Sequence, residues 1–128
     1  MTYFKKFVYD LKPEYSLLIE DDGKVCYAYL YINNKIVGDI WLYNTMKSPV
    51  KAEWHSPDNL PFLNPIEFIK ENIETFDDET NIKIKWGLDN KVVALIYISN
   101  RLIARLSEGD FPGSSSLVIK DGPLAIVM

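Results

Sequence analysis

Two stretches of this chain, CYAYLYINNKIVGDI at residues 26–40 and VVALIYISNRLIARL at residues 92–106, follow the same plan. Identical residues recur at equivalent places, in the pairs Ala28 and Ala94, Tyr31 and Tyr97, Ile32 and Ile98, and Asn34 and Asn100. In each stretch, residues that favour β-structure flank a short polar pair, which is the pattern of a β-hairpin. The repeat therefore predicts a β-rich domain built from two related halves.

The polar pairs Asn33-Asn34 and Ser99-Asn100 predict tight turns, because asparagine accepts left-handed backbone angles better than most residues. Further strands are expected at residues 15–20 and 82–86. Turns are expected at residues 21–23 and 88–90, where glycine, asparagine and aspartate gather. Residues 109–116 are expected to form a loop, with short strands following at 117–119 and 124–127.

A helix is predicted between the two halves, from Pro65 to about Thr75. Asn64 can cap this helix, Pro65 suits its first position, and Glu67 completes a capping box. Apolar residues recur at steps of three and four, at Ile66, Ile69, Ile73 and Phe76. The sequence thus predicts an α+β fold, a mostly antiparallel β-sheet built from two related hairpin halves with one main helix between them.

Regular pairing around the first turn would place Tyr31 opposite Ile36 and Tyr29 opposite Gly38. This register predicts a core face formed by Tyr27, Tyr29, Tyr31, Ile36, Ile40 and Leu42, with the counterparts Val93, Leu95, Tyr97, Leu102, Ala104 and Leu106. The other face would carry Lys35, Asp39, Trp41 and Tyr43, together with Arg101 and Arg105. On this assignment, truncation of Ile36 or Leu102 to alanine should cost about 2 to 5 kcal/mol.

Composition bounds the class of protein. The chain has 128 residues, 48% of them apolar, which is enough for one core and predicts a single domain over residues 1–128. Fourteen basic and eighteen acidic side chains give a net charge of -4, which argues against nucleic acid as a partner. Residues 1–10 lack the apolar core of a signal peptide, and no run reaches the roughly 18 apolar residues of a membrane helix. We therefore expect a cytoplasmic protein that does not bind a membrane.

Catalytic patterns are sparse. His55 lies in a stretch next to Pro57 that nothing predicts to be rigid, so a role as general base is disfavoured. Cys26 is the sole cysteine; it excludes an intramolecular disulfide, and its place in an apolar strand predicts a buried, unreactive thiol. One cysteine and one histidine do not make a zinc site, and residues 77–89 lack the ligand pattern of a calcium loop. We expect no catalytic residues, no metal and no cofactor.

A binding role has more support. Acidic side chains cluster at residues 20–22 and between residues 67 and 79, and the chain contains three tryptophans and eight tyrosines, residue types that often anchor interfaces. Trp41 and Trp54 are the aromatics expected to be exposed. The alternative is that the aromatics fill the core and that the acidic runs are solvated turns.

Three motifs carry a resemblance to a known group: GDIWLYN at residues 38–44, PFLNP at 61–65 and DGPLA at 121–125. On these motifs the chain resembles small bacterial immunity proteins of polymorphic-toxin and contact-dependent growth inhibition systems. The resemblance implies a cytoplasmic protein that binds and blocks one cognate toxin domain, often a basic nuclease, through a charged surface. It designates no catalytic residues. The residues expected to bind the toxin are Asp39, Trp41, Glu71, Glu74, Asp77, Asp78 and Glu79.

Two other functions remain open at this point. A β-rich shell with many aromatic residues could bind a small apolar ligand in its interior. The chain could also be a non-catalytic accessory subunit that pairs through a sheet edge. The sequence leaves the oligomeric state undetermined.

Overall fold

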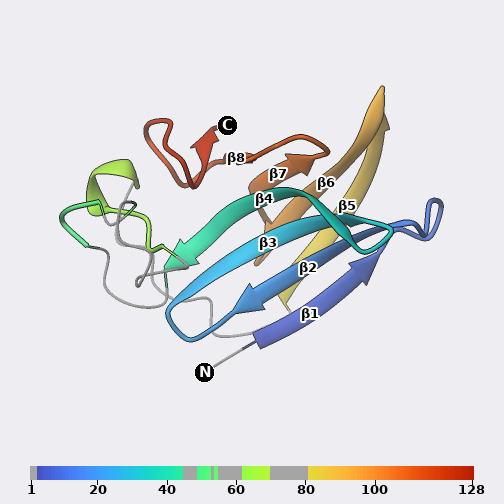
Figure 1. Ribbon diagram of the computed structural model, residues 1–128, viewed down its shortest axis with the longest axis horizontal. Coiled ribbons are helices and arrows are strands. Elements are labelled where there is room, and N and C mark those ends of the chain that lie inside the picture. The colour runs from blue at the N-terminus through green and yellow to red at the C-terminus, as the bar shows by residue number, and fades with distance from the viewer. Residues whose placement is uncertain (1–2, 45–48, 53, 55–61, 70–80) are drawn as a thin grey trace.

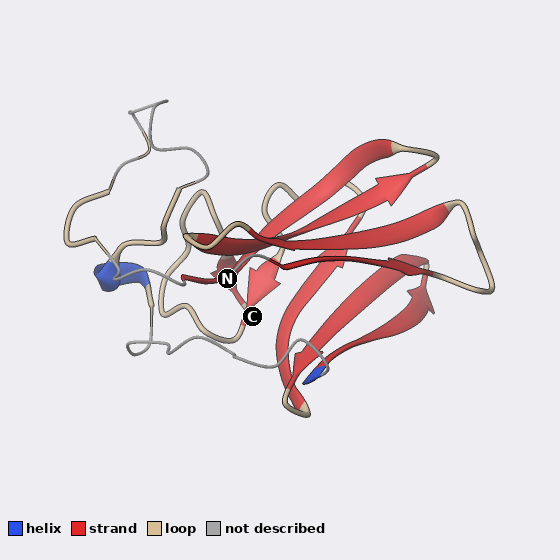
Figure 2. Cartoon of the chain, turned by 90° about the horizontal axis from the view of Figure 1, so that it is seen from below, coloured by secondary structure: helices blue, strands red, loops and turns tan. Residues whose placement is uncertain are grey.

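The computed structural model describes residues 3–44, 49–52, 54, 62–69 and 81–128. These residues form two β-sheets, which Figure 1 shows crossing one another and Figure 2 shows as two layers. The first sheet has four strands in the order β1-β2-β3-β4, and the second has five in the order β5-β6-β7-β8-β9. Each sheet contains one copy of the sequence repeat.

The strands and the short helix have the following bounds. The first sheet comprises β1 (Tyr3–Val8), β2 (Tyr15–Asp21), β3 (Val25–Ile32) and β4 (Lys35–Asn44). A 3-10 helix, η2, spans Ile66–Phe68. The second sheet comprises β5 (Ile82–Asp89), β6 (Lys91–Ile98), β7 (Arg101–Ser107), β8 (Ser114–Ser115) and β9 (Ile126–Val127). All neighbouring strands are antiparallel except β8 and β9, which run parallel.

One hydrophobic cluster joins the two sheets. The first sheet contributes Leu17, Ile19, Ala28, Leu30 and Ile40, and the second contributes Ala94, Ile96, Ile98, Ala104 and Leu106, all with no exposed surface. Because β-strand side chains alternate between faces, each sheet turns one face toward this cluster and presents the other outward. These two outward faces are candidate surfaces for a partner.

The predicted tight turns are confirmed. Asn33 and Asn34 have φ of 49° and 70°, and Ser99 and Asn100 have φ of 52° and 64°. Both central residues of each turn are therefore left-handed, as a primed hairpin turn requires.

The predicted register is wrong beyond the first pairs. Tyr31 pairs with Ile36 as expected, but a shift in register directly before Tyr31 places Tyr29 opposite Asp39. The extra residue is Val37 on β4, so Ile36 and Ile40 of this strand point to opposite faces. Ile36 thus lies on the outward face with its partner Tyr31, and Tyr29 lies on the same face opposite Asp39, whereas Ile40 lies in the core.

The second hairpin repeats this irregularity at the equivalent place. A register shift directly before Tyr97 puts Leu95 opposite Arg105. The expected core positions Leu95, Tyr97 and Leu102 are only partly buried, whereas Ile40, Ala104 and Leu106 are buried as predicted. The two copies of the repeat thus share a bulge at the equivalent place. Regular strand pairing, which the prediction assumed, does not include bulges.

The fold class is corrected as well: the described chain is mostly β, and the helix predicted from Pro65 to Thr75 does not form as predicted. Its expected cap, Asn64, is held by Asn44, whose side chain accepts from the Asn64 N–H and donates to its carbonyl oxygen at 3.0 and 2.9 Å. The chain is extended again at Ile69, with φ of -108° and ψ of 150°. Ile69 there forms an antiparallel bridge with Val118, and residues 70–75 lie outside the described residues.

Gly38 lets β4 approach the second sheet closely, and Gly113 lets the chain that follows β7 pack against β7. A Cβ on Gly38 would lie 2.9 Å from the Ser107 carbonyl oxygen, and a Cβ on Gly113 would collide with the Arg105 carbonyl oxygen. At this contact the Asp39 N–H donates to the Asp110 carbonyl at 2.9 Å. In return, the Gly113 N–H donates to the Asp39 carbonyl at 2.8 Å. The edge strand β4 is therefore hydrogen-bonded to the chain that follows β7.

Ile40 and Ile36 test the corrected faces, because they lie on the same strand. Ile40 has no exposed surface, whereas Ile36 is 43% exposed. We expect Ile40→Ala to lower the free energy of unfolding by about 2 to 5 kcal/mol, because it leaves a cavity in the core. Ile36→Ala should cost much less. Chemical denaturation measures both, and equal losses would contradict the observed faces.

The close approach at Gly113 gives a second test. Gly113→Ala should destabilise the protein by about 1 to 3 kcal/mol, because the added methyl group meets a backbone carbonyl that cannot move without displacing β7. Gly87→Ala is the matched control, since no atom lies within 4 Å of its ideal Cβ position. Thermal denaturation should show a lowered midpoint for Gly113→Ala alone.

Candidate binding face on the first sheet

The outward face of the first sheet carries a row of tyrosines. Tyr27, Tyr29 and Tyr31 alternate along β3, so their side chains point to the same side. We call the outward face formed by Phe4, Lys6, Leu18, Glu20, Tyr29, Tyr31, Ile36 and Asp39 the tyrosine face. Register rows cross it from strand to strand, with Leu18 between Lys6 and Tyr29, and Asp39 opposite Tyr29.

Part of the tyrosine face is hollow and apolar. Phe4, on the edge strand β1, is 67% exposed, and Ile36 is 43% exposed. On this face lies a depression of about 190 Å³, lined by Phe4, Lys6, Ser16, Leu18, Tyr31 and Asn34. Large exposed apolar side chains that gather on one face mark an interaction surface more often than isolated ones do.

Asp39 is the notable charge on this face. Burial raises the pKa of its carboxyl above the ordinary value. Among the described residues, none donates a hydrogen bond or forms an ion pair to this carboxylate. Beside it, burial, Glu20 and Asp39 together raise the pKa of Tyr29 to about 12, so this phenol stays neutral. The centre of the face is thus a partly desolvated negative site beside the phenol groups of Tyr27 and Tyr29.

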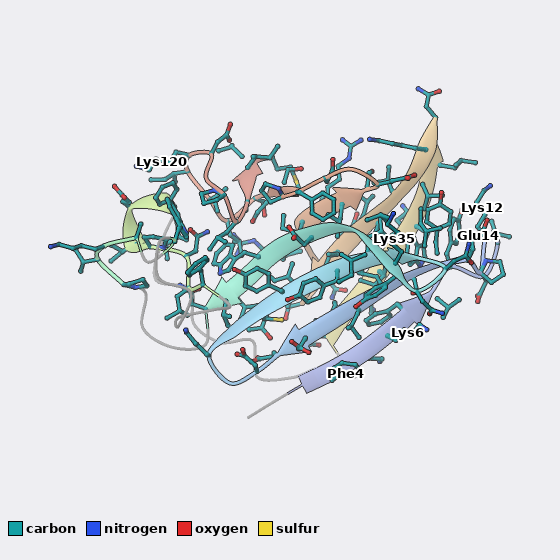
Figure 3. The ribbon with its side chains drawn as sticks, in the orientation of Figure 1. Phe4, Lys6, Lys12, Glu14, Lys35 and Lys120 are labelled. Atoms are coloured by element: carbon teal, nitrogen blue, oxygen red, sulfur yellow. The ribbon has the colours of Figure 1, made fainter. Side chains whose placement is uncertain are left out.

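Basic side chains lie at one end of the first sheet. Figure 3 shows Lys12, Glu14 and Lys35 together at the end formed by the β1–β2 connection and the β3–β4 turn, whereas Lys120 lies at the far end of the molecule. Phe4 and Lys6 follow β1 along its outer margin (Figure 3). Lys12 and Lys35 therefore add positive charge at this end of the sheet.

Trp41 is buried, contrary to prediction. It has no exposed surface, and its indole N–H donates to the Asn44 side chain at 2.8 Å. Asn44 in turn holds the backbone of Asn64, and the Tyr27 hydroxyl donates to the Phe62 carbonyl at 2.8 Å. The segment at residues 62–64 is therefore fastened over this end of the first sheet. By register Trp41 lies opposite Tyr27, on the same side of the sheet as the tyrosine face, but it is buried at this covered end and cannot contact a partner directly.

The other predicted site residues are placed as follows. Glu71, Glu74, Asp77, Asp78 and Glu79 lie outside the described residues, as does His55. Trp54, expected to be exposed, is partly buried, and its ring meets Phe68 edge-on with 4.9 Å between centroids. Of the predicted toxin-binding residues that are described, only Asp39 lies on an accessible face.

The acidic turn and the cysteine serve structural roles. Asp21 is buried, accepts from the Gly23 N–H at 2.9 Å and accepts from the Tyr43 hydroxyl at 3.1 Å. Cys26 is fully buried, and desolvation raises its pKa, so it remains a thiol at neutral pH. This confirms the prediction of a buried, unreactive cysteine.

Sequence reasoning missed the tyrosines and Phe4 as surface residues. The alternation of Tyr27, Tyr29 and Tyr31 was visible, but a two-residue period only shows that they share a face. Regular pairing would put Ile40 on the face of the tyrosines, but the bulge at Val37 on β4 puts Ile40 on the opposite face, in the core.

Comparisons with known proteins supply no relative: no protein-family model, no curated protein and no solved structure matches this chain. Within the part of the chain that the structure describes, no three side chains of histidine, cysteine, aspartate or glutamate gather into a metal-binding group. No helix formed by those residues has both the length and the apolar character to cross a membrane.

The pKa of Asp39 predicts a pH-dependent stability. Because the folded-state pKa exceeds that of the unfolded chain, the folded protein holds more protons between the two values, and stability falls as the pH rises through them. Asp39→Asn should therefore raise the free energy of unfolding at neutral pH. This gain should vanish below the ordinary pKa of aspartate.

Urea denaturation across the acidic and neutral range measures the effect. Glu108→Gln, on an exposed carboxylate beyond β7, is the control and should leave the profile unchanged. A loss of stability in Asp39→Asn at neutral pH would show that the carboxylate has a stabilising partner.

Proposed function

We propose that this protein is a non-catalytic binding module that neutralises a cognate toxin domain in the cytoplasm, and that the tyrosine face contacts the toxin. The observation that carries the proposal is the partly buried carboxylate of Asp39 beside Tyr29, on a face whose margins expose Phe4 and Ile36. The resemblance of three sequence motifs to bacterial immunity proteins supplies the kind of partner.

Tyrosine suits such a contact for a physical reason. Its ring buries a large apolar area at the cost of ordering two side-chain torsions, and its hydroxyl forms hydrogen bonds at the same time. Tyr29 and Tyr31 are already fixed by the strand and are only partly exposed. The face is therefore pre-organised, which reduces the entropy lost when a partner binds.

The charge on the face favours a basic partner. A carboxylate that is half removed from water and lacks a cation among the described residues gains most from an arginine or lysine supplied by another molecule. Its raised pKa predicts that it costs stability at neutral pH, and a residue that costs stability is expected where function requires it. The acidic side chains between residues 71 and 79 remain predicted contributors to the same interaction.

The repeat supplies a matched pair of variants for the test. Tyr31 and Tyr97 occupy equivalent positions directly after the two bulges, but they lie on different sheets. We expect Tyr31→Ala to weaken binding to the product of the neighbouring gene by about tenfold or more, as at an interface hot spot. Tyr97→Ala should leave the affinity unchanged. Calorimetry with the purified pair and rescue of growth on co-expression measure the effect.

Charge reversal tests the electrostatic part. Asp39→Lys should slow association and reduce its dependence on salt, since charge attraction is screened over about 8 Å at physiological ionic strength. Failure of the wild-type protein either to rescue growth or to co-purify with the neighbouring product would overturn the immunity function. Binding that Tyr97→Ala weakens and Tyr31→Ala leaves intact would place the contact on the other sheet.

A further inference from the structure

The second sheet has a different hollow on its outward face. We call it the arginine groove; it measures about 420 Å³ and is lined by Gly87, Leu88, Val93, Leu95, Leu102, Arg105 and Met128. Gly87 pairs with Val93 across β5 and β6, and no atom lies within 4 Å of where a Cβ on Gly87 would stand. The missing side chain at Gly87 leaves part of this space open.

The side chains that line the groove are apolar, except that of Arg105. Arg105 is exposed and lies opposite Leu95, and within the described ranges it forms no ion pair or side-chain hydrogen bond. A guanidinium presents five N–H donors in a rigid fork, and the apolar side chains around it cannot accept any of them. Its side chain therefore offers a cation to a molecule that enters the groove.

The repeat makes this cation more informative. Arg105 and Asp39 occupy equivalent positions of the two hairpins. Asp39 pairs with Tyr29 in the first hairpin, and Arg105 pairs with Leu95, the equivalent of Tyr29, in the second. The two outward faces thus present opposite charges from the same place in the fold. The basic toxin proposed for the tyrosine face would be repelled by Arg105 at the arginine groove. The groove therefore suits a different molecule, one with a negative charge.

We propose that the arginine groove binds an aliphatic carboxylate, with the carboxylate on Arg105 and the hydrocarbon chain against Val93, Leu95 and Leu102. Arginine and carboxylate form paired, charge-assisted hydrogen bonds that a neutral molecule lacks. The apolar side chains recover free energy from the hydrocarbon that they shield from water. The volume falls within the roughly 300–1,000 Å³ of small-molecule sites.

Binding of decanoate, kept below its micelle-forming concentration, tests the proposal. We expect saturable binding by calorimetry, with amide shifts in NMR spectra confined to β6, β7, residues 87–88 and Met128. Arg105→Gln should weaken binding by about tenfold or more, because it removes the charge-assisted pair. Arg101→Gln, on the same strand but outside the lining, is the matched control and should bind as the wild type does.

Further probes separate charge from hydrocarbon. Decanol and acetate, which each lack one of the two features, should bind much more weakly than decanoate, and decyl phosphate distinguishes a need for carboxylate from a need for any anion. Gly87→Leu should abolish binding by filling the groove, with circular dichroism confirming that the variant folds. Decanol binding equal to that of decanoate, shifts spread over both sheets, or an unchanged affinity in Arg105→Gln would overturn the proposal.

Discussion

The close contact between β4 and the chain after β7 fixes the position of the two sheets relative to one another. Gly38 permits it, since a methyl group there would meet the Ser107 carbonyl oxygen, and Gly113 lets the chain after β7 lie close to β7. The backbone of Asp39 is bonded on both sides of this contact, to Asp110 and Gly113. The backbone of Asp39 therefore takes part in the contact between the sheets, and its side chain lies on the tyrosine face. The position of the Asp39 carboxylate depends directly on this contact between the sheets.

The sequence contained the repeat, the hairpin turns and the buried cysteine, because each of these depends on local chemistry. Left-handed angles at Asn33 and Asn34 and an apolar strand around Cys26 need no knowledge of the rest of the fold. The faces could not be predicted, because one extra residue on β4, Val37, puts Ile36 and Ile40 on opposite faces, and nothing in the local pattern indicates a bulge. The helix was a sound local prediction that tertiary contacts override: Asn44 binds the backbone of Asn64, the intended cap.

The repeat has produced two similar sheets with different outward chemistry. At one place in the hairpin the first sheet carries Asp39 among tyrosines, and the second carries Arg105 among aliphatic side chains. The inward positions remain apolar in both copies, since they share one core. Outward positions are free of that constraint and can diverge. This separation explains how a small chain can keep a single core and still offer two distinct surfaces, of which the first is proposed to face a protein and the second a small amphipathic anion.

The central claim is that the first sheet, and not the second, is the protein-binding face. Cross-saturation NMR on the labelled protein, with the unlabelled product of the neighbouring gene as the partner, measures it directly. The account predicts saturation transfer to the side chains of Phe4, Tyr29, Tyr31 and Ile36, with none to Leu95 or Leu102. Transfer confined to Leu95 and Leu102 would contradict it.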